Sequence, residues 1–148
     1  MIFVENYNRR LAIPNDDGII DKEIHCLLRQ PFDVTCLDDT TVTVSTYNGI
    51  EVTIVPSHAT RWKETRFGKW KDVSELKDPG DVTVGNISNV YVTSYTCNSV
   101  VVLESGGRQG RQLISSNDGL SGPPGLHFDI SKNSLLVTKC HVPAPLYH

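Results

Sequence analysis

The stretch Pro79-Gly80-Asp81-Val82-Thr83 decides the fold, because it returns elsewhere in the chain at nearly constant spacing. Pro31-Phe32-Asp33-Val34-Thr35 lies 48 residues earlier, and Pro124-Gly125-Leu126-His127-Phe128 lies 45 residues later. A second block follows each copy, as in Val90-Tyr91-Val92-Thr93-Ser94-Tyr95. A period of about 45 residues built from short alternating stretches is that of a β-propeller blade with four strands.

The amino-acid composition agrees with an all-β fold. Of the 148 residues, 16 are Val, 10 are Ile and 12 are Thr, against only 3 Ala. Branching at Cβ suits a pleated strand and costs side-chain freedom in a helix. A helical bundle or a Rossmann-type fold is therefore not expected. The net charge of −3 excludes a global electrostatic attraction of the whole chain to nucleic acid or anionic membranes.

We expect one propeller region over residues 1–148, an incomplete or open array of four-stranded antiparallel blades. Its blades are predicted at about residues 1–26, 31–75, 79–115 and 124–148. The first blade should lack its first strand, and the last should stop early. In the second blade, residues 55–71 contain no clean fourth strand. Hairpin turns are predicted at Asn15-Asp16-Asp17-Gly18 and Asn48-Gly49.

These repeats resemble NHL repeats, the propeller blades of tripartite-motif (TRIM-NHL) and TRIM-like proteins. The resemblance is carried by Pro79-Gly80-Asp81-Val82, Asn89-Val90-Tyr91-Val92-Thr93 and Asn8-Arg9-Arg10-Leu11, with a partial copy at Pro124-Gly125-Leu126. It covers about 110 residues, and family propellers usually have six blades. It implies a protein-binding scaffold like the substrate-recognition region of a TRIM-type ubiquitin ligase. A truncated, non-functional paralogue is a further interpretation.

A partner-binding face is expected where the second-to-third strand turns and the connections between blades meet. In an antiparallel meander these segments share one end of the sheets. The resemblance places partner binding on this face. The residues predicted to form it are Tyr47, Asn48, Tyr95, Asn98, Trp70 and Lys71.

A basic and aromatic segment suggests RNA binding as the alternative function. Cationic and aromatic side chains together suit the phosphates and bases of single-stranded RNA. The residues that would bind RNA are Arg61, Trp62, Lys63, Arg66, Phe67 and Lys69. The plain alternative is a solvated edge strand whose tryptophans pack on the neighbouring blade.

No enzyme, metal or cofactor site is expected in these 148 residues. The five histidines occupy unrelated repeat positions, and the sequence contains no hydrolase, metalloprotease or phosphate-loop motif. The four cysteines form no C-x-x-C pair, so a RING finger, which ubiquitin transfer would need, is missing from this stretch. Lacking a signal-peptide pattern or an apolar run of membrane-spanning length, the chain is predicted to be cytoplasmic and off the membrane. Open sheet edges could also pair two copies.

Overall fold

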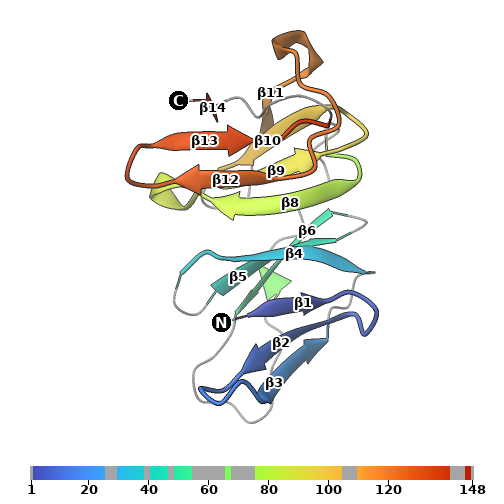
Figure 1. Cartoon of the computed structure of the whole chain (residues 1–148), viewed down its shortest axis with the longest axis vertical. Coiled ribbons are helices and arrows are strands. Elements are labelled where there is room, and N and C mark those ends of the chain that lie inside the picture. Colours follow the sequence, from blue (N-terminus) through green and yellow to red (C-terminus); the bar gives the residue numbers. More distant parts are fainter. Residues whose placement is uncertain are drawn as a thin grey trace.

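A computed structural model of the chain shows four antiparallel sheets that follow one another along the sequence (Figure 1). The residues that it describes are 2–25, 30–38, 41–46, 49–54, 66–67, 76–104, 110–140 and 146–147. Each sheet is a meander in which every strand pairs with its neighbours in the chain. The expected all-β architecture, an incomplete or open propeller-type array, is confirmed.

The sheets have three or four strands each. The first sheet contains β1 (Phe3–Glu5), β2 (Arg10–Pro14) and β3 (Ile20–His25). The second contains β4 (Pro31–Cys36), β5 (Thr41–Thr46), β6 (Gly49–Ile54) and β7 (Arg66–Phe67). The third contains β8 (Pro79–Val84), β9 (Val90–Ser94), β10 (Ser99–Leu103) and β11 (Gly110–Ile114). The fourth contains β12 (Leu126–Asp129), β13 (Ser134–Val137) and β14 (Leu146–Tyr147).

The helical segments of the described residues are two short 3₁₀ turns, η1 (Asn86–Ser88) and η2 (Ser116–Asp118). Among the described residues, no helix is long and apolar enough to cross a membrane. In η2, the Ser115 side chain accepts a hydrogen bond from the Asn117 amide, and Asp118 bonds back to Ser115 in a capping box. This reciprocal bonding satisfies amide groups that a helix start leaves free.

The short strand β7 differs from expectation. No clean fourth strand is predicted for the second sheet, yet Arg66 and Phe67 pair with Thr53 and Val52 of β6. The neighbouring residues 55–65 and 68–75 lie outside the described residues. Two residues suffice for a strand here because β6 offers a free edge along its outer side.

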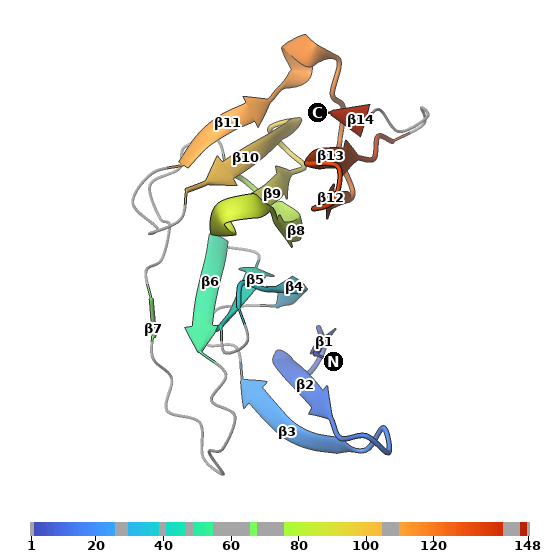
Figure 2. The same cartoon turned by 90° about the vertical axis from the view of Figure 1, so that its left-hand side faces the viewer.

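The strands β1, β4, β8 and β12 lie side by side in a column (Figure 1). In the same view β1 points opposite to β8 and β12, so it has the direction of a second strand in its sheet. The first sheet thus begins without a strand that runs like β8. Seen from the side, the sheets fan out from this column, with β7 and β11 toward the opposite side (Figure 2).

The sheets pack face to face, with an apolar cluster in each of the three gaps. Leu11, Ile24, Val42 and Val44 fill the gap between the first and second sheets. Ile50, Val82, Val90, Val92, Val101 and Leu103 fill the next. Val100, Ile114, Leu120, Leu126, Phe128, Leu135 and Val137 fill the last. Strand β10 contributes side chains to the last two clusters and is buried at all five positions. This burial on both faces explains its continuous run of apolar residues.

Hydrogen bonds between the strands show that the last repeat aligns with the earlier ones one residue away from the alignment expected from the sequence. The Ser45 hydroxyl accepts from the Asp33 amide, and the Thr93 hydroxyl accepts from the Asp81 amide. The Thr138 hydroxyl donates to the carbonyl of Gly125, as the Ser45 and Thr93 hydroxyls donate to the carbonyls of Asp33 and Asp81. Gly125 therefore occupies the place of the two aspartates, and the buried Pro123 corresponds to Pro31 and Pro79. The sequence comparison, which aligned Pro124 with Pro79, is wrong by one residue because two prolines stand together there.

A Gly85→Ala variant is expected to lose about 1–3 kcal/mol of stability through overpacking. Tyr91 and Phe128 stack with ring centroids 5.3 Å apart, and Gly85 lies against both rings. A Cβ on Gly85 would approach Tyr91 Cε2 to 2.6 Å and Phe128 Cε2 to 3.0 Å. Urea unfolding measures the loss, with exposed Ser116→Ala as the control. Equal midpoints for the two variants would contradict this packing.

Candidate functional site

Turns and inter-sheet connections from several sheets gather at one end of the molecule. Asn6 Nδ2 donates to the Pro31 carbonyl over 3.1 Å, which joins the β1–β2 turn to the start of β4. The Tyr95 amide donates to the Asp78 carbonyl over 3.3 Å, which joins the β9–β10 turn to the start of β8. We call this surface the aromatic end: residues 6–9, 30–32, 76–78, 95–98, 119–125 and 138–140.

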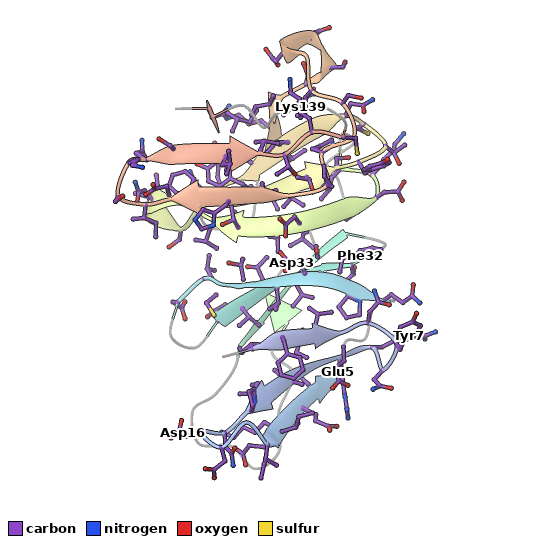
Figure 3. The ribbon with its side chains drawn as sticks, viewed as in Figure 1. Glu5, Tyr7, Asp16, Phe32, Asp33 and Lys139 are labelled. Carbon is purple, nitrogen blue, oxygen red and sulfur yellow. The ribbon has the colours of Figure 1, made fainter. Side chains whose placement is uncertain are left out.

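Exposed aromatic side chains characterise this end. Tyr7, Phe32 and Tyr95 are 97 %, 45 % and 53 % exposed. They come from the first, second and third sheets, one from each. Figure 3 shows Tyr7 and Phe32 on the same side of the ribbon, at the ends of their sheets. Large amphipathic rings with free surface are typical of protein-binding sites.

The Tyr95 ring is positioned by the connection that leads into β12. Gly122, at φ +46°, lies so close that an added Cβ would approach Tyr95 Cε2 to 3.2 Å. Asn98 Oδ1 accepts a hydrogen bond from the Gly122 amide over 2.7 Å, and Cys140 Sγ donates to the Gly122 carbonyl over 3.2 Å. One side of the ring is therefore held by a fixed backbone segment, and the other is free.

The opposite end carries exposed isoleucines. Ile19, Ile87 and Ile130 are 66 %, 81 % and 65 % exposed, each in a turn. Asn86 Nδ2 donates to Asn133 Oδ1 over 2.8 Å and joins two of these turns. We call this surface, residues 15–19, 37–38, 85–89, 104 and 130–133, the isoleucine end. The predicted turn at Asn15–Gly18 is confirmed here: Asn15 Oδ1 accepts from the Asp17 and Ile19 amides.

Two carboxyl groups meet between the second and third sheets. Asp33 Oδ2 accepts from the Val82 amide over 3.0 Å, and Asp81 Oδ2 accepts from the Leu126 amide over 2.7 Å. Each aspartate thus bonds to the first strand of the next sheet. Burial raises the pKa of Asp81 to about 7, and the hydrogen bond that the protonated Asp81 carboxyl donates to the Asp33 carboxyl is the second cause of this shift. Asp81 therefore carries a proton in the folded chain at moderately acidic pH.

The described residues include no group of three His, Cys, Asp or Glu that could hold a metal ion. His127 lies on β12 with an exposed side chain. The free thiols in this part of the chain belong to Cys36, Cys97 and Cys140.

Of the predicted partner-binding residues, Tyr95 and Asn98 fall among the described residues. Tyr95 is exposed, whereas the Asn98 side chain is engaged with Gly122 and supports the turn. The other four, Tyr47, Asn48, Trp70 and Lys71, lie outside the described residues. Because Asn48 is among them, the predicted Asn48-Gly49 turn also lies outside the described residues.

The predicted RNA-binding segment is described only in part. Arg66 and Phe67 form β7, but their side chains are not described. Arg61, Trp62, Lys63 and Lys69 lie outside the described residues. RNA binding by this segment therefore stays a prediction.

Sequence reasoning missed Tyr7 and Phe32. The rule that places second-to-third strand turns and blade connections at one end already covers the β1–β2 turn and the start of β4. The β1–β2 turn is closed by a hydrogen bond from the Arg9 amide to the Asn6 carbonyl, and Tyr7 follows Asn6 in this turn. The β9–β10 turn is closed in the same way, by a hydrogen bond from the Asn98 amide to the Tyr95 carbonyl. Applied to the incomplete first blade, the same rule would have found Tyr7.

Comparison with known proteins gives a likeness of structure but not of sequence. No family model matches the chain, and no curated protein matches it. A streptogramin B lyase structure superposes with a TM-score of 0.69 at 15 % identity, covering 99 % of this chain and 50 % of that one. A virginiamycin B lyase from Staphylococcus aureus gives 0.67 at 17 % identity, with 99 % and 50 % coverage. A nidogen/laminin complex gives 0.64 at 16 % identity, with 95 % and 52 % coverage.

These neighbours are β-propeller proteins, and at such low identity the likeness shows the fold alone. They support the propeller expectation but not membership of the tripartite-motif family. The chain spans about half the length of the structures it matches. It is therefore a set of β-propeller blades stacked in chain order, with aromatic side chains exposed at one end and isoleucines at the other.

Proposed function

We propose that this chain is a protein-binding scaffold that captures its partner through the aromatic end. The observation that carries the proposal is the exposure of Tyr7, Phe32 and Tyr95 at one end of three adjacent sheets. Rings of this size bury a large area at low entropic cost, so they are frequent anchors of protein interfaces.

The nidogen/laminin structure supports the proposal, because it shows a propeller protein in complex with another protein. The streptogramin and virginiamycin lyases show that propellers of this shape also occur in enzymes. The described residues of this chain offer exposed rings in separate sheets, which suit an extended contact. We therefore propose that the chain binds a partner protein.

A finer role follows from the sequence resemblance alone. In a tripartite-motif protein, the partner held by such a face would be the substrate of a ubiquitin ligase. This role rests on the NHL-like motifs, since the structural neighbours do not bear on it.

A Tyr7→Ala/Phe32→Ala/Tyr95→Ala variant is expected to lose at least about tenfold in partner capture, because each buried ring contributes about 1–2 kcal/mol to an interface. Quantitative pull-down measures capture, and thermal unfolding checks that the midpoint stays near that of the unmodified chain. The matched control is Ile19→Ala/Ile87→Ala/Ile130→Ala, which removes as many exposed apolar side chains from the opposite end. Loss of capture in the control but not in the aromatic variant would overturn the proposal.

A further inference from the structure

Charged side chains are distributed unequally between the two ends. In the described turns and connections of the aromatic end, the cations are Arg9, Lys77 and Lys139, and the one carboxylate is Asp78. At the isoleucine end the carboxylates are Asp16, Asp17, Asp38 and Glu104, and the one cation is Lys132. The whole chain has a net charge of −3, so a basic aromatic end is not a consequence of its composition.

The cations of the aromatic end are available to a partner. Arg9 and Lys77 are exposed, and within the described residues no carboxylate forms an ion pair with them or with Lys139. The nearby carboxylates are already engaged: Asp78 accepts from the Thr96 hydroxyl, and Asp118 accepts from the amide and hydroxyl of Ser115. By contrast, Lys132 at the other end pairs with Asp129 over 3.6 Å.

The cations lie next to the exposed rings. Arg9 and Tyr7 share the β1–β2 turn. Lys77 bonds through its backbone to Ser94, the residue before Tyr95. Lys139 Nζ lies close to Gly119, in the connection that also contains Gly122. Tyr7 and Tyr95 therefore each have cationic residues in the segments next to them.

We propose that the segment bound at the aromatic end is an acidic stretch of a partner protein, in extended conformation, with apolar side chains between its carboxylates. The inference rests on the proposed function and adds the chemistry of the partner. Carboxylates would pair with Arg9, Lys77 and Lys139, while apolar side chains would cover the rings.

The spacing of the rings favours a peptide over single-stranded RNA. Packed sheets lie about 10 Å apart, and an extended chain advances about 3.3 Å per residue. Rings from adjacent sheets are therefore about as far apart as residues i and i+3 of an extended peptide, and these two residues share a face when the peptide adopts the polyproline II conformation, with three residues per turn. Bases that stack successively on aromatic side chains need a closer series of rings than one for each sheet.

The experiment starts from a random 15-residue peptide library displayed on phage and panned on the full chain. The enriched peptides are then synthesised and titrated by fluorescence anisotropy in 50 mM and 300 mM NaCl, beside a uridine 15-mer RNA. The test variant is Arg9→Gln/Lys77→Gln/Lys139→Gln. Its matched control, from the opposite end, is Asp16→Asn/Asp17→Asn/Glu104→Gln.

We expect the enriched peptides to be acidic, and to bind about tenfold more weakly to the test variant and at high salt, while the control binds like the unmodified chain. Enriched peptides without an acidic bias, or binding that ignores the three cations, would overturn the acidic partner alone. Peptide binding that survives removal of the three rings would overturn the proposed function instead. No enrichment at all, or tighter binding of the uridine RNA than of any peptide, would overturn both.

Discussion

An Asp81→Asn variant is expected to be more stable than the unmodified chain at pH 7, and to lose the pH dependence that this carboxyl creates. Asp81 has a pKa raised to about 7 in the folded chain, against about 3.9 in an unfolded one. The folded state therefore binds more protons between these values, so the stabilising contribution is complete below about pH 4 and is lost as the pH rises through 7. Discounted for partial exposure, the loss is about 2 kcal/mol.

The physical reason lies in the contacts of the pair. Asp33 of β4 is the ionisable neighbour that acts on Asp81, while the Leu126 amide of β12 and the Val82 amide donate to the pair. An asparagine at position 81 can accept from Leu126 and donate to Asp33 at every pH, as the protonated acid does.

Urea unfolding of both proteins from pH 4 to pH 8 measures the difference. Asp16→Asn, in an exposed turn, is the matched control and should run parallel to the unmodified chain. Parallel curves for Asp81→Asn as well would show that the pKa of Asp81 is not raised in the folded chain.

A Leu103→Ala variant is expected to lose about 2–5 kcal/mol of stability, the largest effect of any single truncation proposed for this chain. Leu103 is fully buried at the end of β10, in the cluster that joins the second and third sheets. Removing three carbons there forfeits their transfer free energy and leaves a cavity that neighbouring valines, short and branched, cannot fill.

Leu113→Ala on the adjacent strand β11 is the control, since Leu113 is 38 % exposed. The same chemical change should cost less than about 1 kcal/mol there. Urea unfolding with an unchanged slope measures both values. Equal losses would mean that the second and third sheets do not pack through β10.

Much of the fold was predictable because its signals are local. The Asn15–Gly18 hairpin and the alternating runs around Val90 and Val100 specify strands and turns within about ten residues. The second-sheet strand at Arg66 was missed, since two residues carry no periodicity. The alignment at Pro124 was off by one residue, since strand pairing and the Thr138–Gly125 hydrogen bond, and no local pattern, show which of the two prolines corresponds to Pro79.

The candidate site was predictable in principle but only partly in its residues. Antiparallel geometry assigns turns to ends, and this rule located Tyr95. The exposure of a turn residue decides whether it can contact a partner, and this exposure depends on neighbours distant in sequence. The Asn98 side chain accepts a hydrogen bond from the Gly122 amide, whereas the Tyr7 side chain is exposed.

The strand order, the meander within each sheet and the turn chemistry follow from the amino-acid sequence, because side-chain alternation and hairpin hydrogen bonds involve residues close together in the chain. The raised pKa of Asp81 beside Asp33, and the gathering of rings and cations at one end, exist only in the folded molecule. They depend on contacts such as Asp33 with Val82, 49 residues apart, and Asp81 with Leu126, 45 residues apart. The distance between such groups is set by how one sheet packs on the next, which no local pattern encodes.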